Sequence, residues 1–240
     1  MSIKTRVLVG AIVLMAVTAF AGPAAAQQEN CTGNPGIDWD IQIGACTAAI
    51  QSGKWKGKGL AWAFYIRGNA YDDKGQYDRA IQDYDQAIKL DPNLALAFNN
   101  RGNAYEKKND YARAALDFDE VTRVNPQDAD AWNGRCWARA IAGQLEQALK
   151  DCNESLRLRP NDANTLNTRG LAYLKLGQFD NAITDYDAAL KGDPKVASSL
   201  YGRGLARQKK GDNAGASVDI AAGKAIDVKI AERLAGYGVK

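Results

Sequence analysis

The sequence after residue 60 repeats with a fixed period, and this feature limits the fold more than any other. A proline, an alanine and a glycine each return at one constant interval, and cysteine replaces the glycine once. A period of about 34 residues is typical of helix–turn–helix units that stack side by side into a solenoid. The recurring residues are Pro92, Pro126, Pro160 and Pro194; Ala80, Ala114, Ala148, Ala182 and Ala216; and Gly68, Gly102, Cys136, Gly170 and Gly204.

Each unit carries the signals of two helices joined by a tight turn. In the first unit, the spacing of Phe64, Gly68 and Tyr71 places them on one face of a helix. Gly75 suits the left-handed residue that ends a helix. Pro92 ends the second helix, because its ring disfavours helical backbone at the preceding residue. The small residues allow the two helices to approach closely, with large aromatic rings interlocked around the contact.

The pattern resembles the motif of the tetratricopeptide repeat (TPR) family. The first unit fills all seven motif positions that we compared, and the fifth departs at Arg207, Gly223 and Val228, as expected of a terminal repeat. The resemblance implies an all-α fold, a right-handed superhelical solenoid of helix–turn–helix TPR repeats. The seven positions of the first unit are Phe64, Gly68, Tyr71, Ala80, Tyr84, Ala87 and Pro92.

The repeat boundaries divide the chain into four parts. We expect a lone capping helix over residues 38–52, a flexible basic linker over residues 53–59, and a closing helix over residues 226–235. The four parts are a signal peptide (1–26), an N-terminal capping segment and linker (27–60), five TPR repeats (61–228), and a C-terminal capping helix and tail (229–240).

The N-terminus has the pattern of an export signal. Lys4 and Arg6 precede an apolar run over residues 7–20, and three alanines end at Ala26. This order is typical of a secretory signal peptide. The alternative is a membrane anchor, but the run is shorter than the roughly 20 residues of a bilayer span. We expect cleavage after Ala26, a periplasmic or secreted protein, and no membrane span once the signal is removed.

The rest of the chain does not indicate catalysis or nucleic-acid binding. Without Lys4 and Arg6, the basic and acidic residues number 29 and 28, and both signs are interspersed. The chain has no histidine, which is the commonest general base and a usual metal ligand. Paired acids such as Asp72 and Asp73 recur on the repeat and are interpreted as surface charge. We expect no enzyme activity, no cofactor, no metal and no nucleic acid.

The four cysteines favour two disulfides. An even number in an exported chain suggests bridges, and no spacing matches a metal or redox motif. Cys136 and Cys152 fall on neighbouring antiparallel helices of the third repeat, within bridging reach. Cys46 occupies a position equivalent to that of Cys152, and Cys31 lies a similar distance before it. We predict the bridges Cys31–Cys46 and Cys136–Cys152. The alternative for the second pair is two buried, reduced thiols.

One arginine and one aspartate recur in every repeat, on the first and second helix respectively. An arginine can donate two hydrogen bonds to one carboxylate, so we predict a ladder of Arg–Asp pairs, either within a repeat or between neighbouring repeats. The alternative is that both are solvated surface charges, worth about 0–1 kcal/mol per pair. The arginines are Arg67, Arg101, Arg135, Arg169 and Arg203, and the aspartates are Asp83, Asp117, Asp151, Asp185 and Asp219.

The first helices of TPR proteins line a concave face. Mapped onto this chain, the resemblance implies a groove with a polar, acidic N-terminal half, which includes Asp72 and Glu106, and an apolar C-terminal half. We expect apolar anchors and asparagine amides to hold a peptide or helix. The alternative is that the closing helix covers Leu171 and Leu205, or that both pack between repeats. The groove residues are Trp62, Tyr65, Asn69, Asn99, Asn103, Asn133, Trp137, Ile141, Asn167, Leu171, Leu174 and Leu205.

The resemblance therefore implies a protein–protein interaction scaffold or adaptor of the bacterial cell envelope. Its partner is a protein or peptide whose identity the sequence does not give. The alternative is a structural envelope component that associates with itself as a homo-oligomer through the same groove.

Overall fold

The computed structural model describes residues 31–34 and 36–239. The predicted signal peptide, with Lys4, Arg6 and the cleavage site after Ala26, lies outside these residues. The described part contains twelve α-helices and no β-strand, which confirms the predicted all-α repeat fold. No helix in this part is both long enough and apolar enough to cross a membrane.

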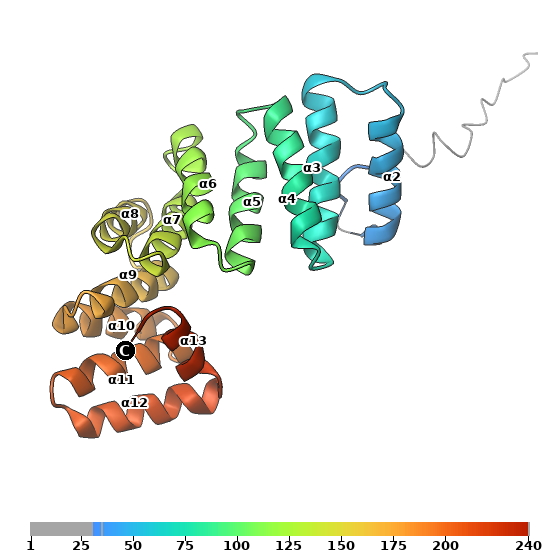
Figure 1. Cartoon of the computed structure of the whole chain (residues 1–240). Helices are drawn as coiled ribbons and strands as arrows, with labels where there is room; N and C mark the ends of the chain where they lie inside the picture. Colours follow the sequence, from blue (N-terminus) through green and yellow to red (C-terminus); the bar gives the residue numbers. More distant parts are fainter. Residues whose placement is uncertain (1–30, 35, 240) are drawn as a thin grey trace, which may run out of the picture.

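Ten of these helices form five pairs that follow one another along a curved stack (Figure 1). Each helix packs against the next one in the chain, both within a pair and between pairs. The pairs are α3 (Gly57–Asp73) with α4 (Tyr77–Leu90), α5 (Ala95–Lys107) with α6 (Tyr111–Val124), α7 (Ala129–Ile141) with α8 (Leu145–Leu158), α9 (Ala163–Lys175) with α10 (Phe179–Gly192), and α11 (Ala197–Lys209) with α12 (Asn213–Ile226). Helix α2 (Trp39–Gln51) precedes the pairs, and α13 (Ile230–Gly236) follows them.

Glycine allows the two helices of a repeat to approach closely. A methyl group added to Gly68 on α3 would lie 2.7 Å from the ring of Tyr84 on α4, and that ring is fully buried. Carbon atoms in ordinary contact are about 3.5–4.0 Å apart, so only glycine fits here without a shift. The turns that follow α3 and α5 contain Gly75 and Asn109, whose positive φ angles of 71° and 60° lead the chain into the second helix.

The two ends of the stack differ from the expected boundaries. Helix α3 begins at Gly57 and packs against α2, so the linker expected over residues 53–59 is shorter than expected. The closing helix expected over residues 226–235 begins only at Ile230. Its start is later because α12 continues through Ile226 before the chain turns.

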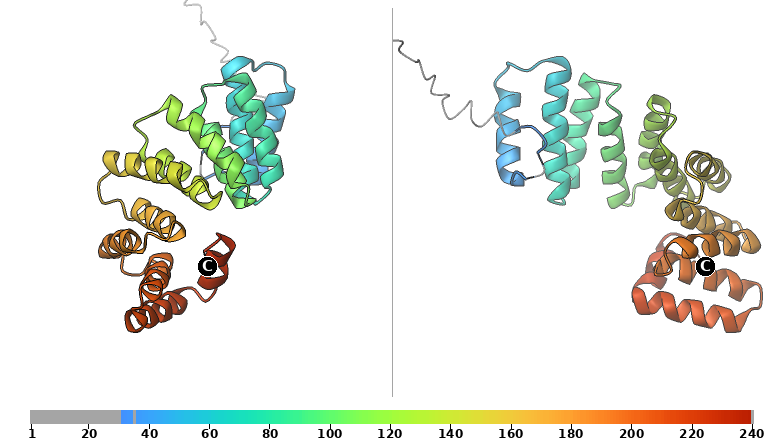
Figure 2. Two further views of the ribbon diagram at one scale, coloured as in Figure 1. Left: turned by 60° about the vertical axis from the view of Figure 1, so that its left-hand side comes forward. Right: turned by 180° about the vertical axis from the view of Figure 1, so that it is seen from behind.

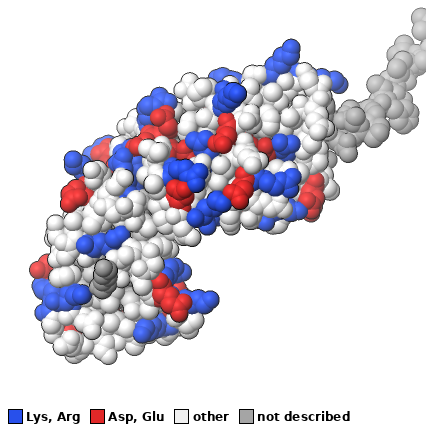
Figure 3. Space-filling model, viewed as in Figure 1, with Lys and Arg blue, Asp and Glu red and all other residues white. Residues whose placement is uncertain are grey.

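The face in Figure 3 carries basic and acidic side chains next to one another over the N-terminal repeats.

Candidate partner-binding groove

The Arg–Asp pairs occur in every repeat and join its two helices. In the first repeat, Arg67 Nε and Nη2 donate to the two carboxylate oxygens of Asp83, each at 2.7 Å. The other four pairs have the same two-bond geometry, with N···O distances of 2.6–3.0 Å. The hydrogen bond to Asp83 raises the pKa of the Arg67 guanidinium. All five aspartates are buried, so the charges form a ladder within the stack.

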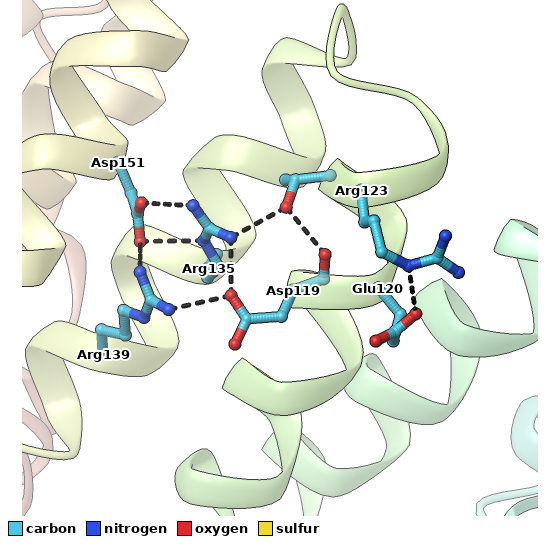
Figure 4. Close-up of polar contacts among 7 residues, drawn as sticks. Asp119, Glu120, Arg123, Arg135, Arg139 and Asp151 are labelled. Atoms are coloured by element: carbon cyan, nitrogen blue, oxygen red, sulfur yellow. Dashed lines mark hydrogen bonds and ion pairs between the residues drawn. The ribbon is translucent and has the colours of Figure 1, made fainter.

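The ladder also joins each repeat to the element that precedes it, through acceptors other than the five predicted aspartates. Arg135 Nη1 and Arg139 Nη2 donate to the same oxygen of Asp119, at 2.6 and 2.8 Å (Figure 4). Arg139 Nη1 also donates to Asp151 at 2.7 Å. Four of the five acceptors, all but Thr47 on α2, recur at the period of the repeat, and this signal could have revealed them. The acceptors are Thr47, Asp85, Asp119, Asn153 and Asp187.

Both predicted disulfides are present. The Cys136–Cys152 bond joins α7 to α8, and the Cys31–Cys46 bond joins the segment before α2 to that helix. All four cysteines are buried. In the third repeat, Cys136 and Cys152 occupy the positions that glycine and an aromatic residue hold in the first. The bond therefore replaces the glycine–aromatic contact with a covalent link between the two helices.

The N-terminal half of the concave face contains a cavity of about 420 Å³ beside α3 and α5. The position of Asn69 is fixed, because its Oδ1 accepts hydrogen bonds from Tyr84 Oη (2.9 Å) and Asn100 Nδ2 (2.8 Å). Asn100 Nδ2 also donates to the buried Tyr65 Oη at 3.3 Å. Two predicted groove residues, Tyr65 and Asn69, therefore help to hold neighbouring repeats together. The cavity is lined among others by Asn69, Asp72, Asp73, Asn103, Glu106 and Lys107.

Three side-chain oxygens on the first helices of the repeats are buried and accept no hydrogen bond from the described part of the chain; those of Asp72 and Glu106 line the cavity, and that of Asn133 lies on α7. Burial raises the pKa of Glu106 to about 7. Burial also raises the pKa of Asp72, although Lys107 Nζ donates to its other carboxylate oxygen at 3.3 Å. A buried polar group without a partner costs about 1–3 kcal/mol. This half therefore favours a ligand that supplies N–H donors or positive charge.

Three other predicted groove residues make local contacts. Trp62 is 37% exposed, and its ring lies 5.0 Å from that of Tyr65. Asn99 Nδ2 donates to the Asn100 side chain at 3.2 Å. Asn167 Oδ1 accepts a hydrogen bond from Ser199 Oγ at 2.8 Å and so links α9 to α11. Trp62 thus lies at the exposed rim, whereas Asn167 serves the packing of repeats.

The C-terminal segment covers the apolar half of the groove. Leu171 and Leu174 are 4% and 7% exposed, and they form one cluster with Ile230 and Leu234 of α13. Figure 2 shows α13 turned back into the hollow of the curved stack. The same cluster is bordered by Trp137, Ile141 and Leu205. Of the alternatives that the sequence left open, the structure has the covered groove at Leu171, whereas Leu205 is half-buried at the border of the cluster.

The fold and the concave face define a class of protein, a helical repeat solenoid with one polar and one self-covered half of its groove. Two family profiles match the sequence. A TPR repeat profile matches residues 68–109 and 170–211, and a tetratricopeptide repeat profile matches residues 99–163. The chain belongs to the tetratricopeptide repeat family. No curated protein matches it.

Solved structures of other proteins share the fold. YrrB, described as a TPR protein with an unusual peptide-binding site, is 23% identical with a TM-score of 0.61, covering 81% of this chain and 98% of its own. MamA from Desulfovibrio magneticus RS-1 is 20% identical with a TM-score of 0.63, covering 70% and 96%. A TPR protein from Parabacteroides merdae ATCC 43184 is 16% identical with a TM-score of 0.71, covering 89% and 86%. At these identities the likeness concerns the fold alone.

Proposed function

We propose that this protein is an interaction scaffold that binds a peptide segment of another protein along its concave face. The buried, unpaired oxygens of Asp72 and Glu106, which line the cavity of the open half, carry the proposal. A peptide brings the missing donors, from its backbone N–H groups and from lysine or arginine side chains. Membership of the TPR family supports an interaction role of this class.

The charge of the cavity favours a basic partner segment. Asp72, Asp73 and Glu106 line it, with Lys107 as the one basic residue among the lining residues. Because the pKa of Glu106 is about 7, this carboxyl becomes negative as the pH rises through neutrality. A cation bound beside it would stabilise the charged form and lower the pKa. Affinity for a basic peptide is therefore expected to increase from pH 6 to pH 8.

Peptides selected from a random display library test this proposal. We expect the selected peptides to be enriched in lysine and arginine. We expect Glu106→Gln and Asp72→Asn each to weaken their binding about tenfold or more, because a hydrogen bond to a charged group contributes about 1.5–3 kcal/mol. Glu146→Gln is the matched control, since Glu146 is an exposed carboxylate on α8. Selected peptides without basic residues, or with affinities that all three variants leave unchanged, would contradict the proposal.

We also propose that the protein works outside the cytoplasm, in the bacterial cell envelope. The two disulfides support an oxidising compartment, because such bonds are rare in the cytosol. Expression in a bacterial host followed by fractionation tests this. We expect a periplasmic or secreted protein whose first residue is Gln27. A full-length protein with Met1 in the cytoplasmic fraction would contradict the export proposal.

A further inference from the structure

The C-terminal segment, residues 230–239, lies against the groove as a bound helix would. Ile230 and Leu234 are 0% and 3% exposed, and both are buried in the cluster of the apolar half. Tyr237 follows Leu234 by three residues, so the three side chains share one face of a helix. A helix that lays an apolar face with this spacing into a groove is a recurring mode of peptide recognition.

The segment contacts repeats that are distant in the sequence. The Tyr237 ring meets Trp137 edge to face at 5.1 Å and Tyr111 at 6.3 Å. Lys175 Nζ donates both to the Tyr237 carbonyl and to the Ala140 carbonyl, each at 2.7 Å. One ammonium thus ties the segment to the end of α7. The segment therefore extends from the fifth repeat across the groove to the third and second.

The segment fills the apolar half incompletely. Helix α13 has seven residues, and an isolated helix shorter than about 12–15 residues is marginal in water. Its order therefore depends on the groove. A cavity of about 230 Å³ remains between α13 and the concave face, so some contacts of the lining side chains are not made. The lining residues include Trp137, Asn167, Leu171, Ser198, Arg233 and Tyr237.

The apolar and acidic halves of the groove meet at Tyr111. Burial, together with Tyr237 and Glu106, raises the pKa of the Tyr111 hydroxyl to about 12. The Tyr111 ring lies 6.3 Å from that of Tyr237, and Tyr111 begins α6, directly after the turn that follows Glu106 on α5. A partner segment that continued past Tyr111 to the end of α5 would reach Glu106 of the acidic cavity.

We propose that residues 230–239 are an internal occupant of the partner site, and that an amphipathic helix of the partner displaces them. The partner helix would carry large apolar residues at the spacing of Ile230, Leu234 and Tyr237. It would continue with a basic residue toward Glu106. Both occupants need the same apolar surface, so the segment and the partner exclude each other. This proposal rests on the proposed function of the concave face and adds its regulation.

The test uses the full-length chain and a fluorescein-labelled peptide with the sequence of residues 228–239. Leu234→Asp places a charge in the apolar contact and releases the segment. Ala235→Asp places the same charge at the adjacent, exposed position and is the matched control. We expect the peptide to bind the Leu234→Asp protein about tenfold more tightly than the wild type or the control, where the internal segment competes. Hydrogen exchange of residues 230–239 should increase in Leu234→Asp alone.

The possible outcomes separate a releasable occupant from a permanent cap. If the peptide binds wild type and Leu234→Asp with equal affinity, or binds neither protein, the segment is a permanent cap and the proposal is wrong. A wild-type dimer that Leu234→Asp dissociates would assign the segment to a second copy and would also overturn the proposal. If circular dichroism shows that Leu234→Asp does not fold, Lys175→Met takes its place, because this change removes only the ammonium contacts of the segment. Peptide affinity for Lys175→Met is then compared with that for the wild type. None of these results depends on Asp72 or Glu106, so the proposed function stands or fails separately.

Discussion

The buried carboxyl of Glu106 gives the sharpest test of the structure, through the variant Glu106→Gln. Burial raises the pKa of this group from 4.5 to about 7. Between these pH values the folded protein keeps a proton that the unfolded chain has lost. The contribution of Glu106 to stability is therefore present below pH 4.5 and is lost as the pH rises through 7. Glutamine keeps the shape without the charge and removes this dependence.

The size of the effect follows from the two pKa values. The difference between 4.5 and about 7 corresponds to about 3 kcal/mol of destabilisation at pH 8, when the carboxyl is charged in both states. At pH 5 the same relation gives a destabilisation of less than about 1 kcal/mol. In a chain of this size, 1 kcal/mol shifts Tm by about 2–4 °C. Glu106→Gln is therefore expected to raise Tm by about 6–12 °C at pH 8.

Thermal unfolding followed by circular dichroism at pH 5 and pH 8 measures this difference. Wild type, Glu106→Gln and the control Glu146→Gln are compared in the same buffers. The control should follow the wild type at both pH values, because Glu146 is exposed. If Glu106→Gln melts with the wild type at pH 8, or gains the same amount at both pH values, the carboxyl is not buried and unpaired as described.

Three further predictions concern the packing and the ladder. Gly202→Ala should lower the free energy of unfolding by about 1–3 kcal/mol, because its methyl group would lie 2.5 Å from the buried Tyr186 on α10. As a control, Gly44→Ala has open space around it and should raise the free energy of unfolding by up to about 1 kcal/mol. Asp151→Ala should destabilise by about 3–5 kcal/mol in urea unfolding, because it leaves two arginines without their shared carboxylate. The double change Cys136→Ala and Cys152→Ala should cost about 3 kcal/mol, as expected for a bridge with a sequence separation of 16. If the unfolding midpoint of one of these variants equals that of the wild type, the contact that the variant removes does not stabilise the fold as described.

Much of the fold could be predicted because its main contacts repeat. The contact of Gly68 with Tyr84 and the pairing of Arg67 with Asp83 each join two helices that are close in sequence. The positions of both pairs recur once in each repeat. A feature that recurs in register reports a contact that recurs in space. The same register placed Cys136 opposite Cys152, so the third repeat could be read as a disulfide variant of the glycine–aromatic contact.

The occupant of the groove could not be predicted in this way. Tyr237 meets Trp137 although the two lie far apart in the sequence, and its segment has no counterpart in the repeats. The repeat pattern placed Glu106 in the acidic half of the groove, but it did not show that one of its oxygens is buried without a hydrogen-bond partner. Periodicity therefore indicated which residues line the concave face. It did not indicate which of them are open, which are covered, and which lack hydrogen-bond partners.

The rigidity of the stack determines how the groove could be regulated. The Arg–Asp ladder links every pair of neighbouring repeats, and the disulfide at Cys136 fixes α7 directly beside Trp137. Opening by bending the solenoid would break the arginine hydrogen bonds between repeats, whereas release of α13 breaks mainly the contacts of one short helix. If partner binding requires this release, apparent affinity falls by the fraction of molecules in which the segment is open. The ratio of peptide affinities for wild type and Leu234→Asp then measures that fraction. Any partner helix that enters the apolar half should bind wild type more weakly than Leu234→Asp by this same ratio, whatever its own affinity.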